Sequence, residues 1–220
     1  MVLDTESSIC QRSFRRLLVS IAYEVVDVNQ ACSSGSVRES HYHIVKQPKG
    51  VELDSVSEAI HGITVVDSQR HGKPLQTVLH HFLTCLNQVS PTAIVGHDIR
   101  GDIQLLVNEA IRTGIHPAEL APLRRLLCTK ELSIAQCRLP LPFHLQYEYP
   151  CDAVLEQMNE TPPKKLSCTF KFPSLEEIYA NLVNPDDLPL QHNAHDARGD
   201  VERCRAVLVH LLLKQKKHWA

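Results

Sequence analysis

The chain has 220 residues, a formal net charge of −2 and a pI near 6.7. The length suits one domain with a full hydrophobic core, and the charge excludes a strongly basic body that holds long nucleic acid by charge alone. No apolar run reaches the roughly 18 to 20 residues of a membrane span, so no membrane partner is predicted. We expect a single domain over residues 1–220.

The eight cysteines are spread along the chain without a CxxC pair, which is poor spacing for a structural zinc site. The N-terminus lacks the charged start and apolar middle of a secretory signal. We therefore expect reduced thiols and an intracellular protein, cytoplasmic or nuclear, that is not secreted.

The first part of the chain has the β-branched pattern of a sheet. Strands are predicted at the extreme N-terminus, over residues 17–28 and over residues 41–45. The polar stretch 29–40 between the last two is typical of a hairpin loop. These features predict an antiparallel start to the sheet.

Helices and a strand alternate in the middle of the chain. Apolar residues at spacings of three and four predict a helix over residues 74–87 and another over residues 99–111, which ends by Gly114. The apolar run 92–96 predicts a strand that feeds the second helix. Residues 129–170 carry five prolines and little periodicity, which predicts a loop-rich insertion and not a second domain.

Two more helices are predicted near the C-terminus. Ser174 followed by Glu177 has the form of a capping box, which opens a helix through Leu182. The last helix covers about residues 197–217, with an apolar stripe and lysines in its last turns. Strands followed by helices interleaved with strands indicate a mixed α/β fold.

Two carboxylates are expected to converge on the first strand. Side chains alternate across a strand, so Asp4 and Glu6 point to the same side while Thr5 points away. Partly buried carboxylates side by side repel each other unless cations lie between them, which indicates a metal site. The simpler alternative is a solvated acidic turn, because surface acids are common.

Two further acids lie at the starts of predicted helices. Asp102 comes one position before the apolar Ile103, at the inner edge of its helix, although a surface acid favoured by the helix dipole is the alternative. Asp200 falls on the apolar stripe of the last helix, where a carboxylate is costly unless it is paired or binds a metal. His195 lies just before that helix and can reach the same place, although most single histidines are structural or exposed.

Taken together, these acids and the histidine resemble the DEDDh exonucleases of the ribonuclease-H-like superfamily. The runs 2–7, 94–102 and 194–201 are similar to the three motifs of that family, and residues 61–64 resemble a non-catalytic signature. The likeness extends from residue 2 to about residue 212 and is interrupted mainly at residues 129–170.

The sequence also departs from the family pattern in two places. Ser7, Ser8 and Ile9 replace the usual threonine and glycine after the glutamate, and Gly101 stands where a phenylalanine is common. The first replacement concerns the turn that normally faces the terminal nucleotide. The resemblance implies that this nucleotide is held by a small group of residues: Thr5, Ser7, Ser8 and His97.

The resemblance implies a ribonuclease-H-like fold, a mixed sheet flanked by helices, and a 3′-to-5′ exonuclease that releases nucleoside 5′-monophosphates. Asp4, Glu6, Asp102 and Asp200 would then bind two divalent ions, Mg²⁺ or Mn²⁺, because hard oxygen ligands suit hard cations. His195 would act as general base toward the attacking water. The charge of the metal ions also explains how a near-neutral chain attracts a phosphate.

The partner implied by the resemblance is the single-stranded 3′ end of a nucleic acid, held over a few nucleotides. DNA and RNA both stay open, and so does the oligomeric state. A binding module that has kept the fold without catalysis is the rival, although degeneration normally removes acids and all five motif residues are present.

Two local alternatives also stay open. His192 and Asp196 form a second histidine–acid pair at a spacing of four, whereas the family spacing of five selects His195 and Asp200. In the insertion, Phe143, Tyr147 and Tyr149 would contact a partner protein, stack on bases or simply pack the loop.

Overall fold

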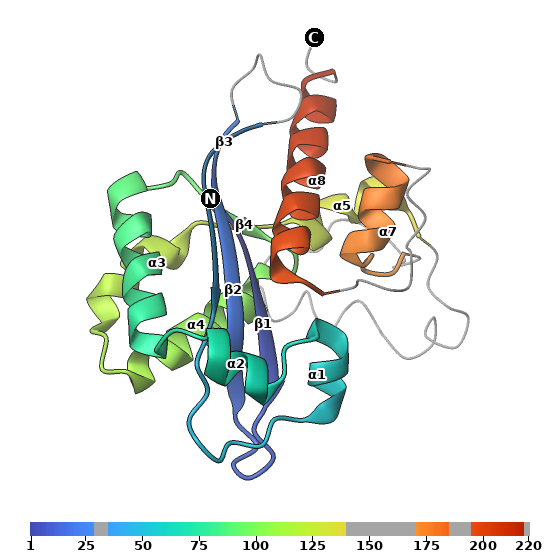
Figure 1. Ribbon diagram of the computed structural model, residues 1–220. Coiled ribbons are helices and arrows are strands. Elements are labelled where there is room, and N and C mark those ends of the chain that lie inside the picture. Colours follow the sequence, from blue (N-terminus) through green and yellow to red (C-terminus); the bar gives the residue numbers. More distant parts are fainter. Residues whose placement is uncertain (29–34, 140–169, 185–194, 218–220) are drawn as a thin grey trace, which may run out of the picture.

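The computed structural model describes residues 1–28, 35–139, 170–184 and 195–217. In these residues a mixed five-stranded sheet lies at the centre, in the order β3-β2-β1-β4-β5 (Figure 1). The first three strands are antiparallel neighbours, and the last two run parallel to the first. The strands are β1 (Val2–Ile9), β2 (Arg16–Asp27), β3 (Ser36–Ile44), β4 (Ile94–Gly96) and β5 (Leu126–Cys128).

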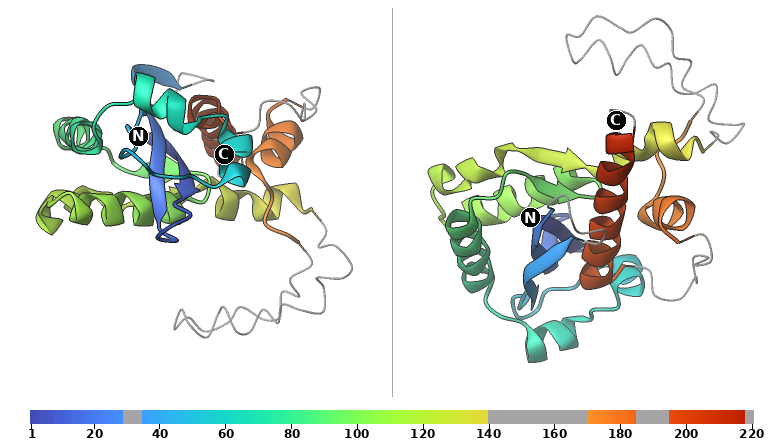
Figure 2. Two further views of the ribbon diagram at one scale, coloured as in Figure 1. Left: turned by 60° about the horizontal axis from the view of Figure 1, so that its bottom comes forward. Right: turned by 90° about the horizontal axis from the view of Figure 1, so that it is seen from above.

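Helices cover both faces of the sheet (Figure 2). Because side chains alternate along a strand, Leu3 packs with α3 and α4 on one face while Val2 packs with α7 and α8 on the other. The helices are α1 (Ser55–His61), α2 (Val65–His71), α3 (Leu75–Val89), α4 (Ile99–Arg112), α5 (Thr129–Cys137), α7 (Leu175–Leu182) and α8 (Ala197–Lys217), with a 3₁₀ helix η1 (Pro117–Arg124). Hydrophobic cores on both of its faces therefore hold the sheet.

Most of the predicted elements are confirmed within a few residues. The predicted mixed α/β class is observed, and α3, α4, β4 and α8 occupy the predicted segments. The capping box is also present, because the Ser174 hydroxyl accepts from the Glu177 amide while the Glu177 carboxylate accepts from the Ser174 amide.

The predicted loop over residues 29–40 was wrong at its end. β3 begins at Ser36, which pairs with Asp27. The first five residues of β3 are exposed, as the outer strand of a sheet allows, so they lack the apolar pattern that predicts a strand. Residues 29–34 lie outside the described residues.

The predicted insertion over residues 129–170 was wrong at its start. Residues 129–137 form α5, which turns Thr129, Ser133 and Cys137 toward the interior at spacings of four. These small and partly polar side chains give little hydrophobic signal, which explains why the sequence did not reveal the helix. Phe143, Tyr147 and Tyr149 lie outside the described residues.

Several short elements were not predicted at all. The helices α1 and α2 have seven residues each and depend on their caps: Asp54 accepts from two backbone amides of α1, and Thr64 forms a capping box with Asp67. Helices of this length bury too little apolar surface to show a clear period. No helix in the described part of the chain is long and apolar enough to cross a membrane.

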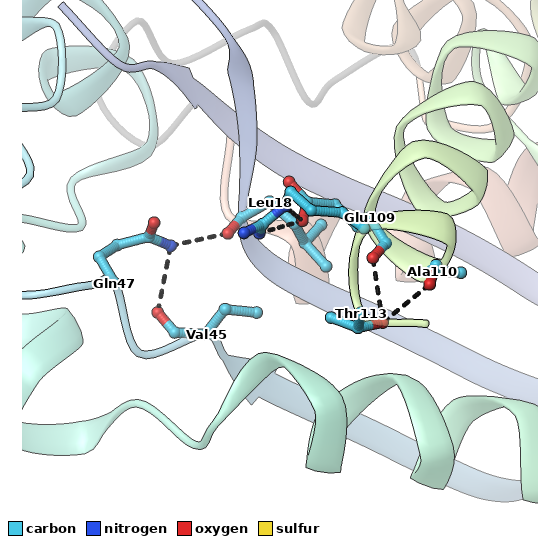
Figure 3. A network of polar contacts seen from close by, with 7 residues as sticks. Leu18, Val45, Gln47, Glu109, Ala110 and Thr113 are labelled. Atoms are coloured by element: carbon cyan, nitrogen blue, oxygen red, sulfur yellow. Dashed lines mark hydrogen bonds and ion pairs between the residues drawn. The ribbon is translucent and has the colours of Figure 1, made fainter. Parts of the chain in front are cut away.

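Polar groups at the C-terminal end of α4 and near Gln47 find hydrogen-bond partners within the fold (Figure 3). The side-chain amide of the buried Gln47 donates to the Leu18 carbonyl at 2.8 Å. The Thr113 hydroxyl donates to the Ala110 carbonyl at 2.9 Å and so closes the last turn of α4. This is the normal state of buried polar atoms, because an unpaired one costs about 1–3 kcal/mol.

One edge of β1 stays open beyond its first residues. β4 is only three residues long and pairs with β1 through Val95 and Val2. At its end, a side chain on Gly96 would place a Cβ 2.9 Å from the Leu3 carbonyl oxygen, so only glycine permits this close approach. Since α4 begins at Ile99, directly after this strand, its first turn lies beside the open edge of β1.

Candidate active site

Three separated segments of the chain meet at the open edge of β1. Asp4 and Glu6 lie on β1, Asp102 lies in the first turn of α4, Asp200 lies in the first turn of α8, and His195 lies just before α8. They share one cleft of about 350 Å³. Its described lining comprises Asp4, Thr5, Glu6, Arg16, His97, Asp98, Gly101, Asp102, Ser174, Leu175, Glu176, His195 and Asp200.

Asp102 is held in place from the opposite side of β1. Thr5 points away from Asp4 and Glu6, and its hydroxyl donates to Asp102 Oδ1 at 2.6 Å. The second oxygen of the same carboxylate, Oδ2, is buried and has no hydrogen-bond partner. A carboxylate oxygen without a hydrogen-bond partner can donate a lone pair to a cation, so Asp102 is suited to bind a metal ion.

Burial raises the pKa of each of the four carboxyls, and repulsion by other members of the group raises the pKa of Asp4 and Glu6 further. For Asp4 the pKa rises well above its usual value, first because of burial and then because of Asp102, Asp200 and Glu6. Burial followed by Asp200 and Asp102 raises the pKa of Glu6 to about 8. Burial raises the pKa of Asp102 to about 7 and also raises that of Asp200. Such a group favours bound cations, which remove the repulsion.

His195 stands at the side of this carboxylate group. Its Nδ1 lies 3.9 Å from Asp200 Oδ2, and the side chain is 47% exposed. A ring nitrogen of His195 and one oxygen each of Glu6 and Asp200 lie within 4.8 Å of one another. Asp200 Oδ1 is fixed by Arg203 Nη1 at 2.9 Å. An imidazole in this position reaches both the carboxylates and the solvent.

No protein-family model matches the sequence, and a search of curated proteins finds no relative. Solved structures do match: E. coli exonuclease I in complex with a dT13 oligonucleotide has a TM-score of 0.67 at 18% identity, over 99% of this chain and 42% of that one. The nuclease domain of 3′hExo, a DEDDh family member bound to rAMP, has a TM-score of 0.62 at 9% identity, over 97% of this chain and 90% of that one. The chain has the fold of these exonucleases. It spans less than half the length of exonuclease I, whose zinc-bound complex with single-stranded DNA matches with a TM-score of 0.63 at 16% identity, over 98% of this chain and 41% of that one.

Of the alternative pair, His192 and Asp196, only Asp196 is among the described residues. His192 lies outside the described residues. Asp196 is exposed, accepts from the Arg198 amide at 3.3 Å and does not line the cleft. The acid that enters the cleft is Asp200, at the family spacing of five from His195.

The four residues that the resemblance assigned to the nucleotide are not all at the cleft. Thr5 and His97 line it, and Thr5 also orients Asp102. Ser7 is outside the lining and accepts from Arg16 Nε at 2.6 Å. Ser8 is buried, and its hydroxyl donates to Asp54 Oδ2 at 3.2 Å.

Arg16 lines the cleft and was not predicted from the sequence. It begins β2, and its Nη1 would lie 3.9 Å from a Cβ at Gly101. The missing side chain of Gly101 therefore leaves space beside the guanidinium. Arg16 also lowers the pKa of Asp102 and of Glu6, against the larger effect of burial. In the sequence, the only signal for this was the glycine at position 101, where the family pattern has a larger residue and where Arg16 now finds space.

In the presence of a chelator, the free energy of unfolding is expected to fall as the pH rises from about 5 to about 8. Glu6 has a pKa of about 8 in the folded chain, against about 4.3 when unfolded. The folded state therefore holds more protons in this interval and loses stability as they are withdrawn. Urea denaturation across the pH range measures the slope, which Glu6→Gln should reduce.

The matched control for this measurement is Glu202→Gln, which removes an exposed carboxylate on α8 outside the cleft. It is expected to keep the slope of the unsubstituted chain. If Glu6→Gln and Glu202→Gln give the same slope, burial does not hold a proton on Glu6.

Proposed function

We propose that the chain is a metal-dependent 3′-to-5′ exonuclease that hydrolyses phosphodiester bonds from the 3′ end of DNA or RNA and releases nucleoside 5′-monophosphates. One observation carries the proposal: four carboxylates from three distant segments meet in one cleft, and a buried oxygen of Asp102 has no partner there. The fold shared with exonucleases of known structure supports it.

Asp4, Glu6, Asp102 and Asp200 are proposed to hold two divalent cations, Mg²⁺ or Mn²⁺, because carboxylate oxygens are the ligands that these ions prefer. When bound, such a pair supplies the charge that activates a water and stabilises the leaving 3′-oxygen. Thr5 contributes by fixing one oxygen of Asp102, so that the other stays directed at the site. Arg203 does the same for Asp200.

His195 is proposed as the general base. Its Nδ1 faces Asp200, so the other ring nitrogen, Nε2, is assigned to take the proton of the attacking water. The exposed side of the ring can then pass this proton to solvent. Positioned proton transfer of this kind accounts for rate factors of about 10² to 10⁴.

Arg16 is proposed to bind a phosphate of the substrate. It is the only lysine or arginine among the described residues that line the cleft. Its hydrogen bond goes to the Ser7 hydroxyl and not to a carboxylate, so the guanidinium charge is not already neutralised by a partner. Arginine donors match phosphate oxygens in geometry and charge.

Asp4→Asn and Asp200→Asn should each abolish nucleotide release while the chain stays folded, since each removes a negatively charged metal ligand. The measurement follows the shortening of 5′-labelled single-stranded DNA and RNA with Mg²⁺ or Mn²⁺, and EDTA should stop it. Asp196→Asn, four residues from Asp200 and outside the cleft, is the control that keeps activity. Full activity in both ligand variants would refute the mechanism.

His195→Ala should lower kcat by about 10²- to 10⁴-fold, because the water loses its general base. Single-turnover measurements at saturating substrate separate this loss from weaker binding. The control is His192→Ala, which removes the neighbouring histidine of the alternative pair. Comparable loss in His192→Ala alone would transfer the role to that residue.

Arg16→Gln should raise the KM for an oligonucleotide about tenfold or more, because a hydrogen bond to a charged group is worth about 1.5–3 kcal/mol. A smaller effect on kcat is expected, since the carboxylates and His195 stay in place. Arg15→Gln removes an exposed cation one residue away and outside the cleft lining. Equal KM values for the two variants would exclude a phosphate contact by Arg16.

A further inference from the structure

A second group of potential metal ligands lies between the sheet and α3, on the face opposite α8. β3 carries Glu39, His41 and His43 at alternate positions, which share one face of the strand. α3 carries His81 and Cys85, which are four residues apart and share one face of the helix. None of the five lines the cleft. The edge strand and the helix thus bring donor atoms together at a place separate from the cleft.

The distance between the nitrogens of His43 and His81 is close to that between two ligands of a tetrahedral ion. His43 Nε2 lies 3.2 Å from His81 Nδ1, whereas two nitrogens bound to one zinc ion at about 2.0–2.1 Å are roughly 3.4 Å apart. One ring nitrogen of His41 joins them, and the three atoms lie within 4.8 Å of one another. The His81 ring stands at 82° to that of His43 and at 70° to that of His41, whereas the two rings on β3 are tilted by only 29° from each other.

Hydrogen bonding alone accounts poorly for this arrangement. His81 Nδ1 lies 2.6 Å from the Tyr23 hydroxyl and 3.2 Å from His43 Nε2. A ring nitrogen offers one hydrogen or one lone pair, so these two contacts compete for it. A cation between the rings would use the lone pairs of both imidazoles.

The surrounding charges are balanced. Lys73 Nζ lies 3.3 Å from His43 Nδ1 and opposes a cation, while Glu39 Oε2 lies 3.2 Å from His41 Nε2 and favours one. Cys85 Sγ lies 3.7 Å from the Glu39 carboxylate, at the side of the histidine group.

We propose that His41, His43 and His81 bind one zinc ion. Three imidazoles suit Zn²⁺, whereas Mg²⁺ and Mn²⁺ prefer the all-carboxylate cleft, so the two sites take different metals. The ion ties the edge strand β3 to α3. Its role is structural and does not depend on the proposed exonuclease activity.

The test uses the full chain with Asp4→Asn and Asp200→Asn, which removes two ligands of the cleft, after treatment with a chelator. Equilibrium dialysis against Zn²⁺ with elemental analysis should find one ion per chain. Zinc should also raise the Tm, because a ligand that binds only the folded state stabilises it. Co²⁺ in place of Zn²⁺ should give the visible absorption of a tetrahedral complex.

His81→Gln in the same background should weaken zinc binding at least tenfold and remove the rise in Tm. Its matched control is His80→Gln, the adjacent exposed histidine of α3, which should bind zinc normally. His41→Gln is a second ligand variant for use if circular dichroism shows that His81→Gln is misfolded. Equal binding by the ligand and control variants, or no bound zinc in the background chain, would overturn the site.

Discussion

Repulsion among four carboxylates held at one edge of β1 is the constraint on which the rest of the structure depends. The negative charges of Asp102 and Asp200 both raise the pKa of Asp4. Such a group does not assemble by itself, so other parts of the fold have to hold it together. Hydrophobic cores do this, because α4 is anchored in one and α8 in another, on opposite faces of the sheet.

The N-terminal ends of α4 and α8 also help to offset the repulsion among the carboxylates. Asp102 and Asp200 both lie in first turns, where the helix dipole favours a negative charge. β4 ends at Gly96, which allows the close approach to Leu3 and brings α4 to the open edge of β1. The shortness of β4 is therefore part of the site, since a longer strand would cover the edge that the carboxylates use.

Charge in this protein is arranged locally and not over the whole surface. The net charge is only −2, yet the cleft gathers several acids and Arg16 within about 350 Å³. The two candidate metal sites divide by ligand type, with carboxylates at the open edge of β1 and imidazoles between β3 and α3. Asp4 and Glu6 project to one face of the sheet and His41 and His43 to the other, because successive side chains of a strand point to opposite faces.

The sequence by itself determined the features that depend on local backbone geometry. It placed Asp4 and Glu6 on one side of a strand, Asp200 on the inner stripe of the last helix and Ser174 at a helix cap. Only the tertiary structure decided which distant groups meet: Thr5 with Asp102, Arg16 with the space at Gly101, and His81 with the histidines of β3. Alternation and helical periodicity follow from a few neighbouring residues, whereas these contacts depend on how helices pack on both faces of the sheet, and no local pattern encodes that packing.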